Sequence, residues 1–381
     1  MALAIELALY CTRTSGKRLQ CSSRAFPVTN VSASRKARVA FCFQEANLSL
    51  LTESREESPP TESIQELSDL QLLWRAVKLP IYSVALIPLS VGSATAFLES
   101  GAFDGGQYSL LLVSSVLVIT WLNLSNDAFD ADTGVDKNKK ESVVNITGSQ
   151  RGVLLASFAC LAFGCAGLLR AALVASDIRV ASLLAAAISC GYIYQCPPFR
   201  LSYKGLGEPL CFLAFGPFAT TAFYLSQSHK AILPLTPTLW GASALVGITT
   251  TLILLCSHFH QVHCKYSSPV LFIQAQIEDD KAVGKISPLV RLGTENGSKV
   301  VTFLVTGLYT GLCALAALKA LPLPCAALCL LTLPVGKMVV DFVSSNHHDK
   351  KKIFLAKYFC VRLHIAFGSA LVLGMLLRAW R

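Results

Sequence analysis

Long apolar runs follow one another through most of the 381-residue chain. Each run approaches the roughly 20 residues that a helix needs to cross the hydrocarbon core of a bilayer. The strict alternation of apolar and polar positions that is typical of membrane β-barrels is absent from these runs. The pattern predicts an all-α polytopic membrane protein with nine transmembrane helices, at about residues 79–98, 108–125, 153–173, 179–196, 209–228, 235–256, 300–320, 321–340 and 358–378.

The composition agrees with a chain that resides mainly in lipid. Hydrophobic residues make up 53% of the sequence and charged residues 15%, whereas soluble domains contain about 25% charged residues. The mean hydropathy is +0.53. The core of a soluble domain does not explain this balance, so the lipid bilayer is the first partner that the sequence predicts.

The positions of the basic residues support the helix count independently. They gather in the connections after the second, fourth, sixth and eighth runs, and alternating crossings would bring all four connections to one membrane face, as the positive-inside rule expects. These residues are Lys137, Lys139, Lys140 and Arg151; Arg200 and Lys204; Lys281, Lys285 and Arg291; and Lys350, Lys351, Lys352 and Lys357. Topology and anion binding therefore explain the net charge of +10. No patch interleaves aromatic and basic residues, so we expect no nucleic-acid partner.

The N-terminal region has a different composition. No Asp or Glu occurs between Leu7 and Gln44, and seven Lys or Arg residues are scattered there among Ser and Thr. This composition indicates a transit peptide over residues 1–40, and the abundance of serine favours a plastid. Residues 41–71, rich in Glu and Pro, predict a flexible acidic linker before a transmembrane domain at 72–381. We expect a chloroplast membrane, inner envelope or thylakoid, with the basic loops facing the stroma.

Acidic and amide side chains crowd the end of the second apolar run. If the helix continues to Asp130, the pairs Asn123–Asp127 and Asn126–Asp130 each lie four residues apart on one helix face. Carboxylates this close repel one another unless a cation lies between them. Their oxygens are ligands that Mg²⁺ prefers, and Lys139 beyond them can neutralise phosphate charge. We interpret the cluster as a Mg²⁺–polyphosphate site; the alternative is a solvated acidic helix end.

A second acidic cluster follows the sixth run. Glu278, Asp279 and Asp280 precede Lys285 and Arg291, so this loop also combines carboxylates with cations. Because both loops follow even-numbered helices, the topology places them on the same membrane face. The sequence therefore predicts two Asp-rich loops with cationic neighbours on one membrane face.

The cysteines and histidines do not indicate a different metal. The 14 cysteines are spread through the apolar runs without a Cys-x-x-Cys pair, which favours free thiols over disulfides. His258, His260 and His263 lie beside Cys264, but this spacing lacks the second ligand pair of zinc sites.

With two acidic motifs in a nine-helix pattern, residues 72–380 resemble the UbiA superfamily of intramembrane aromatic prenyltransferases. Members are nine-helix bundles whose two Asp-rich motifs, after the second and sixth helices, bind Mg²⁺ and an isoprenoid diphosphate. The resemblance implies metal ligands at Asn126, Asp127, Asp130, Asp136, Glu278, Asp279 and Asp280, of which Asp127, Asp130, Asp136 and Asp280 are the implied catalytic residues. It implies substrate contacts at Asn123, Lys139, Asn145, Tyr203, Lys204, Lys285 and Arg291.

The motif spacing indicates a branch of this superfamily. Asp136 follows Asp130 by six residues, a longer step than the Asp-x-x-x-Asp of the 4-hydroxybenzoate enzymes. With the Gly-Lys-x-Ser-Pro-Leu-Val-Arg-Leu-Gly segment at 284–293, it resembles the MenA-type dihydroxynaphthoate prenyltransferases. That branch implies transfer of a phytyl group from its diphosphate to 1,4-dihydroxy-2-naphthoate with loss of the ring carboxylate, a step of phylloquinone biosynthesis.

Several alternatives remain open at this point. Within the superfamily they are homogentisate prenyltransferases, chlorophyll synthase and menaquinone-type long-chain transfer; outside it, an ion-coupled transporter would also use membrane carboxylates. The base that activates the aromatic ring is Glu141, Tyr203 or Glu208. One departure from the family pattern also stands out, because residues 263–277 interrupt the second motif. We hypothesise that they are a non-native insertion, from an unspliced intron or a faulty gene model, since Val262 can be encoded by a codon that begins GT.

Overall fold

A computed structural model describes residues 79–133, 142–227, 233–259 and 288–380, and every regular element within these ranges is a helix. Eight of the described helices are long and apolar enough to cross a membrane. The pair Leu323–Leu330 and Leu333–Asn346, bent by 44°, provides a ninth crossing if it spans as one unit. The predicted all-α membrane architecture is therefore confirmed for the described part of the chain, with eight apolar spans, or nine if the bent pair crosses as one.

The elements follow the predicted runs with adjusted bounds. The long helices are α4 (Ser83–Ser100), α5 (Gly105–Thr133), α7 (Gln150–Ala175), α8 (Ile178–Gln195), α11 (Pro237–His258), α13 (Pro288–Ala317) and α17 (Ala356–Ala379). Among them, α13 is broken by a kink at Gly293, whose backbone is not helical. Two spans are composite: α9 (Gly207–Leu213), the π-helical η3 (Ala214–Thr220) and α10 (Thr221–Ser226) form one, and α14 (Leu323–Leu330) with α15 (Leu333–Asn346) forms the other. The short elements are η1 (Leu79–Tyr82), α6 (Val143–Thr147), η2 (Leu201–Lys204) and α16 (Lys350–Ile353).

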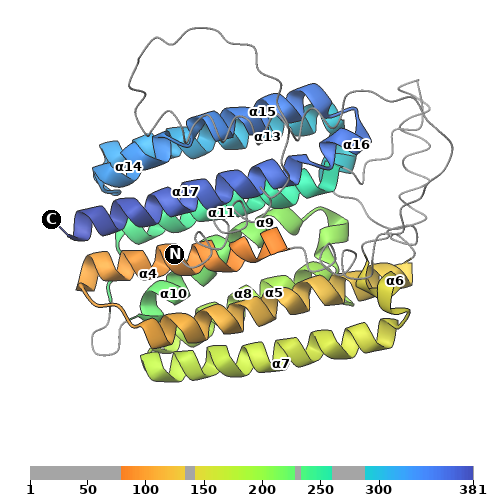
Figure 1. Cartoon of the computed structure of the whole chain (residues 1–381), viewed down its shortest axis with the longest axis horizontal. Helices are drawn as coiled ribbons and strands as arrows, with labels where there is room; N and C mark the ends of the chain where they lie inside the picture. The colour runs from red at the N-terminus through yellow and green to blue at the C-terminus, as the bar shows by residue number, and fades with distance from the viewer. Residues whose placement is uncertain (1–78, 134–141, 228–232, 260–287, 381) are drawn as a thin grey trace, which may run out of the picture. The chain divides into compact units, whose positions relative to one another are not determined.

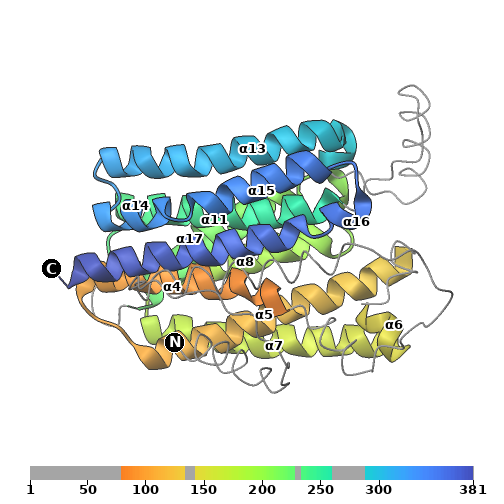
Figure 2. The same cartoon turned by 45° about the horizontal axis from the view of Figure 1, so that its top comes forward.

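The long helices lie side by side in one bundle (Figures 1 and 2). α5 packs along α7 at one edge, whereas α13, α14 and α15 lie at the other, and α17 between them packs against α4, α11 and α14. The most apolar windows of α11 and α4 are 72% and 67% buried, but those of α7 and α8 only 22%. Since α7 and α8 expose large apolar side chains such as Phe163 and Ile178, we assign their outer faces to lipid.

A glycine allows α5 and α7 to approach closely. A Cβ atom at Gly164 of α7 would lie 2.9 Å from Cγ2 of Val118 and 3.1 Å from the backbone oxygen of Ser114, both on α5. Such distances are shorter than ordinary van der Waals contacts, so only glycine fits without moving the helices apart. This contact holds the helix that carries the first acidic motif.

Two helices differ from the predicted spans in ways that affect this motif. The second span was expected to end near residue 125, but α5 continues to Thr133 and keeps Asn126, Asp127 and Asp130 on a helix. The fifth span was expected as one helix at 209–228, but its centre is the π-helical η3, which contains Pro217. Proline has no N–H for the α-helical ladder, and a π turn is one way to accommodate it.

Candidate active site

A cavity of about 380 Å³ opens among α4, α5, α8, α9, η3, α11 and α17. Most of its lining is apolar, including Leu168, Leu184 and Phe223. Polar side chains enter the lining near the C-terminal ends of α5, α8 and α11, in the turn η2 and at the N-terminal end of α17, namely Asn123, Asn126, Asp130, Tyr194, Gln195, Ser202, Ser257, His258 and Lys357. The cavity therefore has one polar end and a long apolar interior, which suits a ligand with a charged head and a hydrocarbon tail.

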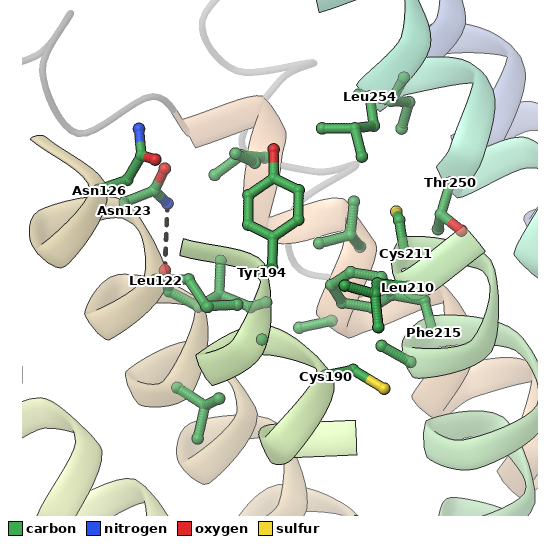
Figure 3. Close-up of a pocket in the computed structure, with 18 of the residues that line it drawn as sticks. Leu122, Asn123, Asn126, Cys190, Tyr194, Leu210, Cys211, Phe215, Thr250 and Leu254 are labelled. Carbon is green, nitrogen blue, oxygen red and sulfur yellow. Dashed lines mark hydrogen bonds between the residues drawn. The ribbon is translucent and has the colours of Figure 1, made fainter. Parts of the chain in front are cut away.

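Figure 3 shows this change in polarity. The side chains of Asn123 and Asn126 extend from α5 at the level of the Tyr194 hydroxyl, whereas Cys190 and Phe215 lie at the opposite end of the Tyr194 ring. The amide of Asn123 also donates a hydrogen bond to the carbonyl of Ile119, one turn earlier on α5, at 3.2 Å.

The first acidic motif is buried and held by hydrogen bonds. Asp127 and Asp130 are 1% and 4% exposed. Nδ2 of Asn126 donates to Oδ2 of Asp130 at 3.2 Å, and the hydroxyl of Tyr203 donates to Oδ1 of Asp130 at 2.7 Å. The backbone N–H of Val143 donates to Oδ2 of Asp127 at 2.9 Å and ties α6 to the end of α5. The prediction that Asn126 and Asp130 share a helix face is confirmed.

Local sequence explains why Tyr203 reaches Asp130. It lies in the single turn η2, which is preceded by Arg200 at φ 43° and followed by Gly205 at φ 80°. Both residues have left-handed backbone conformations, which the absence of a Cβ makes inexpensive at Gly205. The guanidinium of Arg200 lies 5.7 Å from the ring centroid of Phe129 and 5.8 Å from that of Tyr203. These cation–π contacts fix the turn against the end of α5.

The other predicted substrate contacts occupy different places. Asn145 lies exposed on α6, and Lys204 and Arg291 are exposed as well. Nη2 of Arg291 donates to the backbone carbonyl of Lys204 at 3.3 Å, so the guanidinium lies against the turn that carries Lys204. None of the three lines the cavity. Asp136, Lys139, Glu278, Asp279, Asp280 and Lys285 lie outside the described residues, as do the predicted transit peptide, linker and insertion.

Two polar groups of the cavity were not among the predicted site residues, although the sequence analysis considered His258 as a possible zinc ligand. Nδ1 of His258 on α11 lies 3.0 Å from Oε1 of Glu208 on α9, and Nζ of Lys357 lies 3.7 Å from the ring centroid of Phe354. Lys357 entered the sequence argument only as a basic residue of a connection. A lysine at the start of an apolar helix, on the same predicted membrane face as the two acidic motifs, was a usable indication of a site residue.

The donors of the first motif fit a hard divalent cation. Asn126, Asp127 and Asp130 offer only oxygen ligands, in the type and number that Mg²⁺ or Ca²⁺ accepts from one side of a site. Within the described ranges no three His, Cys, Asp or Glu residues lie close enough to hold a metal by themselves. A complete site therefore needs ligands from elsewhere, and the second acidic motif falls in the part of the chain that is not described.

Comparison with known proteins decides the family. The model of the UbiA prenyltransferase family matches residues 85–363, which is more than half of the chain. The chain belongs to the UbiA prenyltransferase family. This prenyltransferase is 56% identical over 316 residues to the chloroplastic 2-carboxy-1,4-naphthoquinone phytyltransferase of Arabidopsis thaliana, in a match that covers 82% of this chain and 79% of the relative. It is 40% identical over 324 residues to the Synechocystis protein of the same activity, over 84% of this chain and 97% of the relative.

Solved structures support the fold of the prenyltransferase. The UbiA homolog from Aeropyrum pernix superposes with a TM-score of 0.55 at 15% identity, over 78% of this chain and 98% of that one. A UbiA homolog from Archaeoglobus fulgidus superposes with a TM-score of 0.51 at 14% identity, over 81% and 100%. The helical bundle is therefore shared although most side chains differ.

Proposed function

We propose that this prenyltransferase transfers the phytyl group of phytyl diphosphate to 1,4-dihydroxy-2-naphthoate, with release of diphosphate and CO₂, in phylloquinone biosynthesis. The observation that carries the proposal is the cavity, whose polar end is formed by Asn126 and Asp130 and whose interior is apolar. The 56% and 40% identity to two phytyltransferases supports this choice of substrates over other members of the family.

The residues of the first motif suit the diphosphate end of the donor. Asn126, Asp127 and Asp130 would hold Mg²⁺ from α5, and Asp136 with Glu278, Asp279 and Asp280 would complete the ligands. The metal would neutralise the charge that develops on the departing diphosphate. Lys139, Lys204, Lys285 and Arg291 are the cations proposed for its outer oxygens, and Tyr203 keeps the Asp130 carboxylate in place.

The apolar interior suits the phytyl tail and the carbon that reacts. When the bond to diphosphate breaks, the allylic carbon becomes a delocalised cation that water would capture. The lining by Leu168, Leu184, Phe215 and Phe223 excludes water from this carbon. An electron-rich carbon of the naphthoate ring then attacks, and the ring carboxylate is lost. Since the tail is accommodated between membrane helices, phytyl diphosphate can react without its chain leaving the bilayer.

We also propose that the protein is directed to a chloroplast membrane. Residues 1–40 would act as the transit peptide, 41–71 as a linker and 72–381 as the catalytic domain, with the acidic loops on the stromal side. The relative from Arabidopsis is described as chloroplastic, and the described helices provide up to nine apolar spans.

Residues 263–277 are proposed to be absent from the functional protein. Sequencing mature transcripts across the junction at Val262 tests this, and the expected transcript joins Val262 directly to Glu278. If all mature transcripts retain the intervening codons, the insertion belongs to the protein.

A direct assay tests the proposed activity. Membranes containing the expressed protein are incubated with Mg²⁺, phytyl diphosphate and either 1,4-dihydroxy-2-naphthoate or homogentisate, and products are read by mass spectrometry. We expect a phytylated naphthoquinol that has lost the carboxyl carbon. Transfer to homogentisate but not to naphthoate would refute the substrate assignment.

Variants in the same membranes test the metal assignment. Asp127→Ala and Asp130→Ala should each abolish transfer with the protein still inserted. Asp341→Ala, which removes an exposed carboxylate of α15 outside the cavity, is the matched control and should retain activity. Near-normal transfer by either motif variant would contradict the assignment.

A further inference from the structure

His258 and Glu208 form a buried pair at the polar end of the cavity. His258 is the last residue of α11 and Glu208 is the second residue of α9. They are 3% and 9% exposed, and Nδ1 of the imidazole lies 3.0 Å from Oε1 of the carboxylate. The bundle thus brings together two titratable groups that are 50 residues apart in the sequence.

The geometry of the pair leaves one imidazole nitrogen for a ligand. His258 lines the cavity, and its single hydrogen bond to the described residues uses Nδ1. A carboxylate at Nδ1 fixes the tautomer in which Nδ1 carries the proton and Nε2 carries a lone pair. Oε2 of Glu208 is also buried without a hydrogen-bond partner among the described residues. A salt bridge that served packing alone would be expected to satisfy both oxygens.

We infer that His258 is the general base for the aromatic acceptor and that Glu208 is its positioning residue. The inference rests on the proposed function, because it assigns the group that receives the acceptor's hydroxyl proton. Nε2 of His258 accepts the proton of the hydroxyl next to the ring carboxylate. Glu208 holds the ring of His258 and stabilises the imidazolium that forms.

The proton, the electrons and the leaving groups balance within this scheme. The allylic carbon–oxygen bond breaks with its electron pair on diphosphate. The ring carbon that bears the carboxylate bonds to the allylic carbon while the neighbouring hydroxyl gives its proton to Nε2 of His258. The bond to the carboxylate then breaks, CO₂ leaves, and its electron pair returns to the ring, whose oxygen takes the proton back. His258 ends as it began, and the product is the prenylated hydroquinone.

Two of the three bases left open by the sequence fit this role less well, and the third, Glu141, lies outside the described residues. The hydroxyl of Tyr203 donates to Asp130, and Glu208 reaches the cavity wall only through His258, because Glu208 itself does not line the cavity. An imidazole is also the side chain whose ordinary pKa is suited to accepting a proton near neutral pH.

Other titratable groups face the same cavity and must be separated from His258 by experiment. On the elements packed around it they are Asp130 of α5, Cys190 and Tyr194 of α8, Cys211 of α9, and Lys357 and Tyr358 of α17. Both oxygens of Asp130 already accept hydrogen bonds, from Tyr203 and Asn126. The pH dependence of single variants therefore identifies the base.

The test compares the full-length wild-type protein with His258→Asn, in which the Asn amide can still donate to Glu208 but no base remains. Transfer from saturating phytyl diphosphate to dihydroxynaphthoate is measured from about pH 5.5 to 9, the range in which imidazole titrates. We expect kcat of His258→Asn to fall about 100- to 10,000-fold. We also expect the acid limb of the pH profile, which is the decline of kcat toward low pH, to disappear. Glu208→Gln should lower kcat less and displace the acid limb.

His364→Asn is the matched control, because His364 is another buried histidine whose Nδ1 lies 2.8 Å from the Thr249 hydroxyl and which does not line the cavity. It should keep the wild-type pH profile even if less folded protein is recovered. An acceptor ring with a more acidic hydroxyl gives a second readout. Because this hydroxyl needs the base less, the ratio of the wild-type kcat to the His258→Asn kcat should be smaller with this acceptor.

The outcomes separate this inference from the proposed function. Absence of transfer by the wild-type protein would contradict the proposed function. Transfer by the wild type together with an unchanged acid limb in both His258→Asn and Glu208→Gln would overturn the role of the pair. An equal defect of His258→Asn with ordinary and acidic acceptors would also overturn it. If His258→Asn does not fold, Glu208→Gln tests the role instead. A displaced acid limb in its pH profile of kcat, together with a smaller defect on the acceptor with the more acidic hydroxyl, supports the role of the pair, and the absence of both overturns it.

Discussion

Replacing Tyr203 by Phe removes one buried oxygen from the first acidic motif. The Tyr203 hydroxyl donates to Oδ1 of Asp130 at 2.7 Å, and the carboxylate is only 4% exposed, so water does not readily replace the lost donor. Hydrogen bonds to charged groups contribute about 1.5–3 kcal/mol. Asn126 still donates to Oδ2, so the carboxylate keeps part of its orientation and the effect should fall in the lower part of this range.

A cost of about 1.5–2 kcal/mol corresponds to about a 10- to 30-fold change in an equilibrium or rate, because about 1.4 kcal/mol is tenfold. Since Asp130 is a proposed metal ligand, we expect Tyr203→Phe to raise the Mg²⁺ concentration for half-maximal transfer by this factor. Loss of a group that orients a ligand typically costs about as much in metal affinity. The assay titrates Mg²⁺ at saturating phytyl diphosphate and naphthoate in washed membranes.

Tyr224→Phe is the control for this substitution. The Tyr224 hydroxyl is also buried and donates to the carbonyl of Pro234 at 2.8 Å. This substitution therefore also removes a buried, hydrogen-bonded tyrosine hydroxyl, but at a position outside the cavity. Tyr224→Phe should lose stability but keep the wild-type Mg²⁺ requirement. The reasoning would be wrong if Tyr203→Phe showed the wild-type requirement, or if both variants shifted it equally.

Two further predictions concern stability. Gly374→Ala should lower the thermal unfolding midpoint in detergent, because the new Cβ would lie 2.6 Å from the backbone nitrogen of Cys325 and overpacking costs about 1–3 kcal/mol. Gly311→Ala is the control, because a Cβ there meets nothing within 4 Å. Equal unfolding midpoints for the two variants would contradict the packing argument. At the start of α8, the Arg179 guanidinium hydrogen-bonded to Asp177 holds the pKa of that carboxyl below its usual value. The pair therefore stabilises the fold at pH values above about 4, the ordinary pKa of an Asp side chain. This contribution is lost as the pH falls through the lowered pKa of Asp177 in the folded protein. Asp177→Asn, which can still cap the helix, should be less stable than wild type at neutral pH, and the difference should shrink in acid; a difference independent of pH would refute the assignment.

The sequence predicted the helical class, the span count and the first motif because these depend on local pattern. Hydrophobic runs of membrane length identify spans without knowledge of their neighbours, and a four-residue step places Asn126 beside Asp130 on any helix. The extension of α5 to Thr133 was less visible, since its last turns are polar and hydropathy alone ends the span near residue 125.

The pairing of His258 with Glu208 was not predictable in the same way. Their contact depends on which helices are neighbours and on the rotation of α9 relative to α11, and neither follows from the periodicity of one segment. The π-helical turn at Pro217 affects that rotation, because a π turn shifts the register of the residues around it. Glu208 was recognised as a candidate base, but the imidazole between it and the cavity was not.

The length of α5 has a consequence for how the protein responds to its membrane. Its 29 residues extend for about 43 Å, roughly 13 Å more than the hydrocarbon thickness of about 30 Å, so an upright α5 that begins at one edge of the hydrocarbon would carry Asp127 and Asp130 beyond the other edge. In a bilayer of ordinary thickness, the diphosphate can bind at headgroup depth while its tail stays among the acyl chains. A thicker bilayer would draw the same carboxylates toward the hydrocarbon and impose a hydrophobic mismatch on the reacting end of the helix. We therefore expect the rate of transfer to depend on acyl-chain length, and vesicles of graded thickness would measure how deep in the bilayer the reaction takes place.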